Sequence, residues 1–287
     1  MRNHRKALTC LFLAALLFLT ACGKVSLPSL PTAKQATEQE AVVESVAEPA
    51  QEAEPTPEPE PVPETPESRA AALGLPAPPD IDISSWEFAL ANYYNSINEY
   101  ELKNYGGFEG QGFDVRAVED LYAFIHAGRD AGYHIYAGAA YRNLEWCLNH
   151  YAQKVRDLGS AAAAASAENS VVHGTGVNEH QTGLAVDFTE MAMIGLTYSD
   201  YTNDGFEDTE SFAWLYEHCA DYGFIYRYPA DKVFYYGVDC VEGHFRYVGK
   251  EAAKYIMENN LCLEEFLLLY DDEAVYQPDL WEAAGKH

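Results

Sequence analysis

Two short stretches of this 287-residue chain carry side chains that could perform metal chemistry. In the first stretch, His180 and Asp187 stand near the two ends of the apolar run Thr182 to Phe188. An imidazole nitrogen and a carboxylate oxygen are both good zinc ligands. On a regular strand these two side chains would point to opposite faces, because they are an odd number of residues apart. They can converge only if His180 lies on the incoming turn, and Gly183 would supply the backbone freedom for that bend.

The second stretch, Asp239 to Gly249, supplies a third ligand and a carboxylate. If it is extended, one face carries Glu242, His244, Arg246 and Val248. Two imidazoles and one carboxylate leave zinc a fourth position for water, whose pKa the metal lowers to about 7. A nearby glutamate can then take a proton from that water. The two stretches together predict a zinc hydrolase centre, whereas the simpler alternative is a surface strand with solvated side chains.

With their surroundings, from about Phe113 to Glu265, both stretches resemble the zinc D,D-carboxypeptidases of the VanY type. Those proteins are peptidoglycan peptidases with a Hedgehog/DD-peptidase-like fold. The matching motifs are Ala140-Tyr141-Arg142, Glu179-His180-Gln181-Thr182-Gly183-Leu184-Ala185-Val186-Asp187, Trp214-Leu215, Tyr222 to Pro229 and His244 to Ala252. So many matches in the same order are very specific.

The resemblance implies that zinc is held by His180, Asp187 and His244. It also implies that Arg142 binds the terminal carboxylate of the substrate, a role that suits the planar fork of a guanidinium. Tyr141 and Gln181 are expected to contact the substrate beside it.

Three positions depart from the family pattern. The family's base stands three residues before the last histidine ligand, and here that position is Val241. Glu242 is one residue too close, but a loop adjustment at Gly243 could bring its carboxylate to the site, so we assign Glu242 as the catalytic base. The family generally has Ser and Gln where this chain has Asn143 and Cys147, so the substrate contacts of those positions are not carried over.

These residues predict zinc-dependent removal of the C-terminal D-alanine from peptidoglycan stem peptides. The alternatives are an L,D-carboxypeptidase acting on tetrapeptides, and a non-catalytic peptidoglycan-binding module that uses the same cleft. The expected partner is the stem peptide, and we expect a monomer. A formal charge of −27 argues against nucleic acid as a partner.

The N-terminus predicts export and a lipid anchor. Basic residues precede an apolar run from Ala7 to Leu19, which is too short to span a bilayer and fits a secretory signal. The run ends in Leu19-Thr20-Ala21-Cys22, which resembles the bacterial lipobox. We therefore expect residues 1–21 to be a cleaved signal peptide and Cys22 to carry the lipid; an ordinary signal peptide is the alternative. The anchor would hold the protein on the outer face of the bacterial cell membrane. We expect the protein to contact the membrane through this lipid anchor only.

The next segment, residues 22–79, is expected to be a disordered tether. Twelve of the 14 prolines lie before Asp80, and the segment is rich in Glu and poor in aromatic residues. Such a composition cannot bury enough apolar surface to offset its chain entropy. Residues 80–287 are then left as a single zinc carboxypeptidase domain.

The elements that must position the ligands follow from hydrophobic periodicity. Helices are expected over 86–102, 114–132, 144–158, 211–222 and 250–259, with an Ala-rich helix or flexible insert over 160–168. Strands are expected over 133–139, 182–188 and 244–248. Because helices and strands do not alternate regularly, the pattern favours an α+β fold in which helices flank a central antiparallel sheet.

Once the signal peptide, which contains Cys10, is cleaved and Cys22 is lipidated, four cysteines remain. They are Cys147, Cys219, Cys240 and Cys262. In an exported domain four cysteines allow three disulfide pairings, and the sequence does not choose among them. Unpaired buried thiols are the alternative.

Overall fold

A computed structural model describes residues 65–97, 100–161, 177–190, 205–237 and 241–279. Contacts divide the chain into residues 1–59 and 60–287, and all described residues belong to the second unit. Its α-helices are α1 (Pro66–Ala72), α2 (Val118–Asp130), α3 (Leu144–Leu158), α5 (Glu210–His218), α6 (Val233–Tyr236), α7 (Lys250–Glu258) and α8 (Leu263–Tyr270). Short 3-10 helices are η1 (Trp86–Phe88), η2 (Glu179–Thr182), η5 (Phe206–Asp208), η6 (Cys219–Tyr222) and η7 (Ala230–Lys232). Within the described ranges, no helix is long and apolar enough to cross a membrane.

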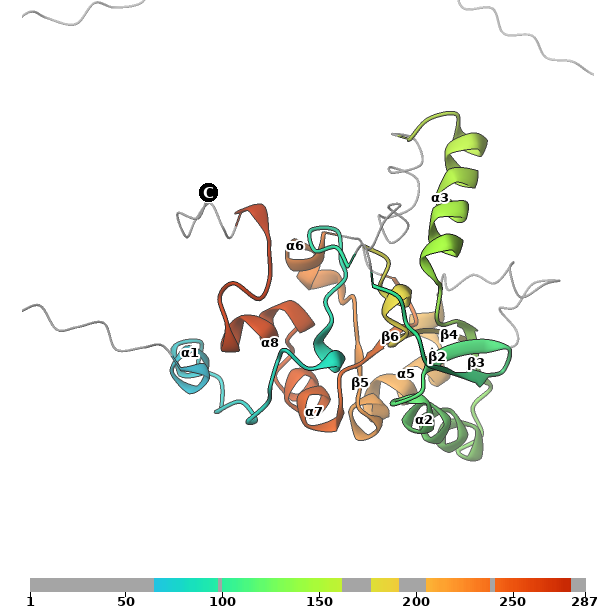
Figure 1. The fold of residues 1–287 in the computed structure, drawn as a ribbon. Coiled ribbons are helices and arrows are strands. Elements are labelled where there is room, and N and C mark those ends of the chain that lie inside the picture. The colour runs from blue at the N-terminus through green and yellow to red at the C-terminus, as the bar shows by residue number, and fades with distance from the viewer. Residues whose placement is uncertain (1–64, 98–99, 162–176, 191–204, 238–240, 280–287) are drawn as a thin grey trace, which may run out of the picture. The chain divides into compact units, whose positions relative to one another are not determined.

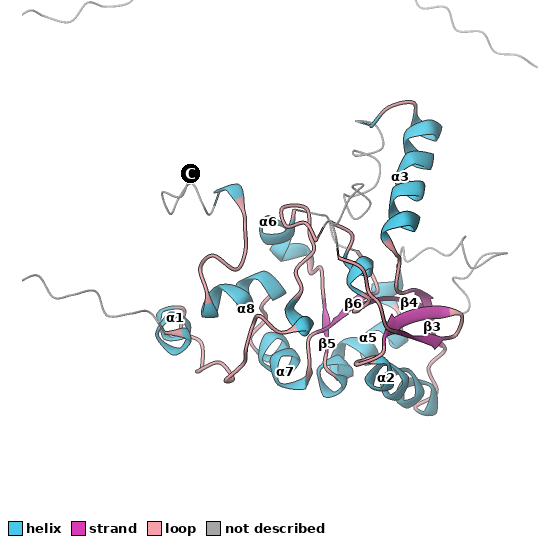
Figure 2. Ribbon diagram, viewed as in Figure 1, coloured by secondary structure: helices cyan, strands magenta, loops and turns pink. Residues whose placement is uncertain are grey.

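The central sheet is antiparallel and has the strand order β3-β4-β6-β5. Its strands are β3 (Ile135–Ala139), β4 (Ala185–Glu190), β5 (Phe224–Tyr226) and β6 (His244–Tyr247). A separate hairpin joins β1 (Tyr105–Phe108) to β2 (Gln111–Asp114). Figures 1 and 2 show the central sheet among helices and long loops. The predicted α+β class and the antiparallel sheet are therefore confirmed.

One face of the sheet is apolar and forms the main core with α2 and α5. Phe188 of β4 and Phe245 of β6 lie on this face, and their rings contact Phe124 of α2. The alternation of a strand sends every second side chain to the opposite face. That opposite face receives Asp187, His244 and Arg246, which are all buried.

A second apolar cluster lies around α7 and α8 and includes the start of the described chain. Ala70 of α1 is fully buried in it, and Arg69 donates from Nη1 to the carbonyl of Leu268 at 3.4 Å. The Tyr255 and Tyr270 hydroxyls each donate at 2.7 Å to carbonyls of residues 76 and 79. Residues 65–79 thus pack with the folded unit, so the predicted domain start at residue 80 came too late.

The sequence predicted some helices correctly and others wrongly. The bounds of α3 agree with the prediction because the Asn143 side chain accepts a hydrogen bond from the Trp146 amide at its start, and Gly159 ends it in a left-handed conformation. The prediction of a helix over 86–102 was wrong, since η1 is the only helical segment among the described residues of that range, 86–97 and 100–102. A side-chain oxygen of Asn92 accepts hydrogen bonds from the amides of Tyr94 and Asn95, at 2.9 and 2.8 Å, and turns the chain. Most of the Ala-rich segment over 160–168 lies outside the described residues.

Replacing Gly183 with alanine is predicted to destabilise the protein by about 2–5 kcal/mol, through left-handed strain and overpacking. Gly183 has φ +72°, and a Cβ there would lie 2.2 Å from Cδ2 of the buried Leu102 side chain. Chemical denaturation monitored by circular dichroism measures the loss.

The matched control is Gly132→Ala. Gly132 also has a positive φ, +99°, but a Cβ there would have no atom within 4 Å. Its loss should be limited to the backbone strain of about 1–2 kcal/mol. Equal losses in the two variants would contradict the predicted steric contribution at Gly183.

Candidate metal centre

Three side chains from two stretches of the chain meet on the polar face of the sheet. Asp187 and His244 are register partners in the antiparallel β4–β6 pair, so they share one face. Asp187 Oδ1 lies 2.8 Å from His244 Nδ1, and its Oδ2 lies 3.1 Å from His180 Nε2. One ligand atom from each of the three residues lies within 4.8 Å of the others. The sequence-predicted trio is thus brought together in a geometry that could hold one metal ion.

His180 lies on the turn η2 and not on strand β4, so its odd spacing from Asp187 does not put the two side chains on opposite faces. The Asn178 side chain accepts a hydrogen bond from the His180 amide at 3.0 Å and caps the turn. Gly183 ends the turn in a left-handed conformation, and its amide donates to the His180 carbonyl at 3.1 Å. His180 therefore lies on the incoming turn beside the strand, as the sequence required for convergence.

The environment of the trio fits a bound group. Its donor set of two imidazole nitrogens and one carboxylate oxygen is one that zinc accepts. Among the described residues, four buried side-chain polar atoms lack a hydrogen-bond partner. Three of them lie on or next to the same turn, Asn178 Nδ2, His180 Nδ1 and Gln181 Oε1, and the fourth is Thr189 Oγ1 on β4. Because His180 faces Asp187 through Nε2 and not through the unpaired Nδ1, the fit to a metal rests on the donor set.

Burial and neighbouring charges shift the pKa values of the trio in different directions. Burial, together with the Arg142 charge, lowers the pKa of His180 against the opposing effect of Asp187. Burial alone would lower the pKa of His244, but hydrogen bonds to Asp187 and Glu179 raise it. Burial would raise the pKa of Asp187, but the two histidines lower it well below its usual value. An ionised carboxylate thus lies between the imidazoles.

Arg142 lies beside this trio. Its Nη2 is 3.9 Å from Asp187 Oδ2, and its backbone amide donates to the His180 carbonyl at 3.2 Å. The guanidinium carbon lies 4.5 Å from the centre of the Trp146 ring, a cation–π distance. The side chain of Arg142 is 21% exposed, so the guanidinium can reach a ligand from solvent. Trp146 was not singled out from the sequence, although it lies one helical turn after Arg142.

Tyr141 and Gln181 lie next to these groups in the chain and in space. The Tyr141 amide donates to the Gly112 carbonyl at 2.8 Å, and its ring lies 5.3 Å from that of Tyr105. Gln181 is fully buried and donates from Nε2 to the Tyr100 carbonyl at 2.9 Å, which leaves its Oε1 unpaired. Gln181 thus has an acceptor available on the same turn as His180.

Glu242 has a different neighbour. One of its carboxylate oxygens accepts a hydrogen bond from the Glu207 amide in η5 at 3.1 Å. The next residue, Gly243, has φ +75°, so the alternation that would place Glu242 on the face of His244 is broken. The carboxylate is therefore held toward η5. Asp239 and Cys240 lie outside the described residues.

Sequence reasoning missed the buried charges behind the ligands. Glu179 is fully buried, and its Oε2 lies 3.0 Å from His244 Nε2. Burial would raise the pKa of Glu179, but the charges of Arg227 and Arg246 lower it overall. The only signals in the sequence were that Glu179 precedes a ligand and that Arg246 shares a predicted face with His244. Neither signal indicates a contact between the two residues.

Comparisons with known proteins agree with this fold. Residues 111–250 match the sequence profile of the VanY family, described as D-alanyl-D-alanine carboxypeptidase. A D-alanyl-D-alanine carboxypeptidase of Enterococcus faecalis is 34% identical over 193 residues, which are 65% of this chain and 67% of that protein.

Two solved structures extend the likeness to three dimensions. A variant of the vancomycin-resistance D,D-pentapeptidase VanY, from a VanB-type cassette and in complex with Zn(II), has 33% identity and a TM-score of 0.53. The alignment covers 64% of this chain and 99% of that one. VanYB in complex with D-alanine-D-alanine has 34% identity and a TM-score of 0.53, covering 64% and 98% of the two chains. The fold is therefore the Hedgehog/DD-peptidase-like fold expected from the sequence. More specifically, the chain belongs to the VanY family of D-alanyl-D-alanine carboxypeptidases.

The described cysteines are predicted to be unreactive thiols in the native protein. Cys147, Cys219 and Cys262 are free and buried, and no disulfide joins any two of them. Burial raises the pKa of Cys147 to about 11 and that of Cys219 to about 12, so few thiolates form near neutral pH. Iodoacetamide at pH 8 should label these residues slowly before denaturation and completely after it.

Peptide mass spectrometry without a reducing agent checks this expectation and identifies each labelled cysteine. A linked pair of peptides containing any two of these three cysteines would contradict it.

Proposed function

We propose that this protein is a zinc carboxypeptidase that removes the C-terminal D-alanine from peptidoglycan stem peptides. The observation that carries the proposal is the convergence of His180, Asp187 and His244 within 4.8 Å, beside the partly exposed Arg142. Membership of the VanY family, and the Zn(II) and D-alanine-D-alanine bound in two related structures, support the choice of metal and substrate.

The three ligands would hold Zn²⁺ through His180 Nε2, His244 Nδ1 and a carboxylate oxygen of Asp187, the atoms that already face one another. Bound zinc supplies Lewis-acid activation of water and of the scissile carbonyl. Three protein ligands are the usual number in catalytic zinc sites, because they leave a coordination position open.

Arg142 would bind the terminal carboxylate of the peptide and so restrict cleavage to the chain end. A guanidinium can bind both oxygens of a carboxylate at once, and the Trp146 ring contacts this one at a cation–π distance. The closest described carboxylate to it, Asp187, lies at the long distance of 3.9 Å. Tyr141 and Gln181 would contact the substrate next to Arg142, with Gln181 Oε1 as a hydrogen-bond acceptor.

Glu242 would act as the base that accepts a proton from the attacking water and returns it to the leaving amine. For this role its carboxylate must exchange the hydrogen bond from the Glu207 amide for one with the water. The left-handed Gly243 next to it provides a flexible joint for such a movement.

The protein would work outside the cell membrane, where peptidoglycan lies. The apolar N-terminal run and the lipobox-like Leu19-Thr20-Ala21-Cys22 support export and lipidation at Cys22. Two acyl chains give stable anchoring where a single chain gives only marginal binding. Residues 23–64 would form the tether from that anchor to the domain, which would act as a monomer.

Removal of a metal ligand is predicted to abolish zinc binding. Asp187→Asn and His244→Ala should each lose equimolar zinc on dialysis, since each leaves two of the three ligands. Zinc content by plasma mass spectrometry measures this loss. His218→Ala is the matched control, because His218 also faces an aspartate, Asp221 at 3.6 Å, but lies away from the site. Retention of full zinc by both ligand variants would contradict the assignment.

Wild-type protein with zinc is predicted to release D-alanine from a muramyl pentapeptide. Glu242→Gln should lower kcat at least about 100-fold and retain zinc, because it removes the base without removing a ligand. Free D-alanine measured with D-amino acid oxidase gives the rate. Glu210→Gln, at an exposed carboxylate on α5, is the control and should remain active.

Other outcomes of the same assay identify a different function. Release from a tetrapeptide alone would indicate an L,D-carboxypeptidase. Binding of both peptides without release would indicate a peptidoglycan-binding module. Full activity in Glu242→Gln would leave the enzyme but remove Glu242 as its base.

A further inference from the structure

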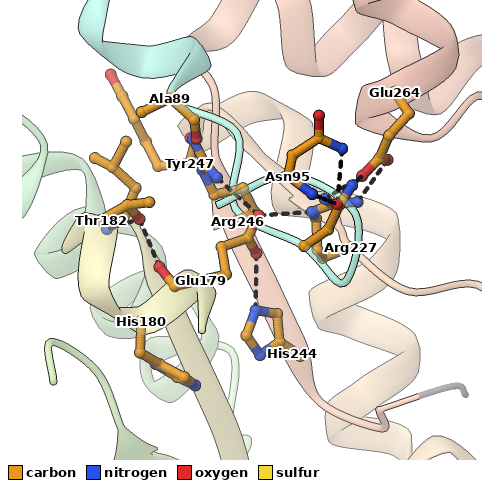
Figure 3. A network of polar contacts seen from close by, with 12 residues as sticks. Ala89, Asn95, Glu179, His180, Thr182, Arg227, His244, Arg246, Tyr247 and Glu264 are labelled. Carbon is orange, nitrogen blue, oxygen red and sulfur yellow. Dashed lines mark hydrogen bonds and ion pairs between the residues drawn. The ribbon is translucent and has the colours of Figure 1, made fainter. Parts of the chain in front are cut away.

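A chain of buried charges leads from the proposed metal centre to α8. His244 Nε2 lies 3.0 Å from Glu179 Oε2, and Arg227 donates from Nε to Glu179 Oε1 at 2.7 Å. The other end of the Arg227 fork binds Glu264 of α8 in a bidentate pair, at 2.9 and 2.6 Å. Figure 3 shows these side chains in one connected network. The side chains of all four residues have no exposed surface.

Glu264 is itself held in place from the N-terminal side of the domain. Asn92 donates from Nδ2 to Glu264 Oε1 at 2.7 Å, and its own oxygen is fixed by the amides of Tyr94 and Asn95. Asn92 and Glu264 both lie outside residues 111–250, the part that matches the family profile. Two segments beyond the matched region therefore converge on the groups behind the metal site.

Arg246 fixes the same glutamate from a second direction. It donates from Nη1 to Glu179 Oε1 at 2.7 Å, and from Nη2 to the carbonyls of Glu87 and Ala89, both at 2.8 Å. Glu179 Oε1 thus accepts from two arginines, which leaves Oε2 directed at His244. The carboxylate has little freedom to rotate.

This arrangement has a consequence for the His244 ring. A carboxylate at Nε2 favours the tautomer that carries the proton on that nitrogen, which leaves the Nδ1 lone pair free for a metal. Nδ1 is the nitrogen that faces Asp187. Burial of the four charged side chains of this network costs desolvation free energy. These are Glu179, Arg227, Arg246 and Glu264. A gain in net stability is therefore a poor explanation for the network.

We propose that Glu264 is a positioning residue for the metal centre, acting through Arg227 and Glu179 on the orientation and tautomer of His244. The inference rests on the zinc site proposed above, but it concerns metal binding and does not require turnover. Asn92 serves the same purpose one contact further out, because it fixes the Glu264 carboxylate.

The test measures zinc affinity of the full chain by competition with a chromophoric chelator, together with the thermal midpoint of the metal-free protein. Glu264→Gln keeps the size of the side chain and removes its charge. Zinc affinity should fall about 10-fold, the lower end of the effect of residues behind metal ligands. The absorption spectrum of the Co(II)-substituted protein should also change, since it reports ligand geometry.

Glu265→Gln is the matched control. Glu265 is the neighbouring glutamate on α8, but it pairs with Lys232 at 3.0 Å and caps the Cys262 amide, away from the network. It should lower stability without changing zinc affinity or the Co(II) spectrum. Asn92→Ser, a milder change, should weaken zinc binding less than Glu264→Gln and covers the case in which that variant does not fold.

A double-mutant cycle tests the route through Glu179. If Glu264 acts through Glu179, the effect of Glu264→Gln on zinc affinity should disappear in a Glu179→Gln background. A persistent 10-fold effect there would overturn the proposed route.

Unchanged zinc affinity in folded Glu264→Gln, or in Asn92→Ser if the former does not fold, would overturn the inference and leave a purely structural role. That failure is distinguishable from failure of the proposed function. Wild type that binds zinc but releases no D-alanine would remove the enzyme while these affinity differences remain. Wild type that binds no zinc would overturn both.

Discussion

The antiparallel pairing of β4 with β6 is the constraint on which the site depends. It sets Asp187 opposite His244 on one face of the sheet and sends Phe188 and Phe245 into the core on the other. A slip of one residue would exchange the faces and bury the ligands among aromatic rings. The apolar packing against α2 therefore fixes the register, and the register places the proposed metal ligands Asp187 and His244.

Negative and positive charges compensate one another around the proposed metal centre. Asp187 and Glu179 bring two buried negative charges to the neighbourhood of His244. Arg227 and Arg246 neutralise Glu179 on the side away from the ligands. The side facing Arg142 holds the Asp187 carboxylate between two imidazoles, where a cation would be favourable. The charge of Glu179 is thus neutralised by the two arginines, whereas the charge of Asp187 is available to a metal ion.

Local sequence signals predicted those parts of the fold that depend on local interactions. The capping residue Asn143 and the terminal Gly159 fixed the limits of α3, and the three side chains that converge, His180, Asp187 and His244, stand in short motifs. The segment 86–102 did not follow its apolar periodicity, because distant partners override it. Arg246 takes the carbonyls of Glu87 and Ala89 as acceptors, which stabilises a non-helical path.

The contacts behind the ligands could not be predicted in this way. Arg227 is 48 residues from Glu179 and 37 residues from Glu264, so no periodicity connects them. The orientation of Glu242 was also beyond the sequence, because a single left-handed glycine at position 243 decides which way its carboxylate points.

The position of Glu264 near the end of the chain has a consequence for the order of events during biosynthesis. His180 and Asp187 emerge together, whereas His244 and then α8 follow much later. Folds that depend on contacts of high sequence separation form slowly, because the loop between the partners must be closed first. The network of buried charges behind His244 is therefore complete only when α8 has docked. Because metal binding is coupled to folding, docking of α8 and binding of a metal ion by the trio would favour each other.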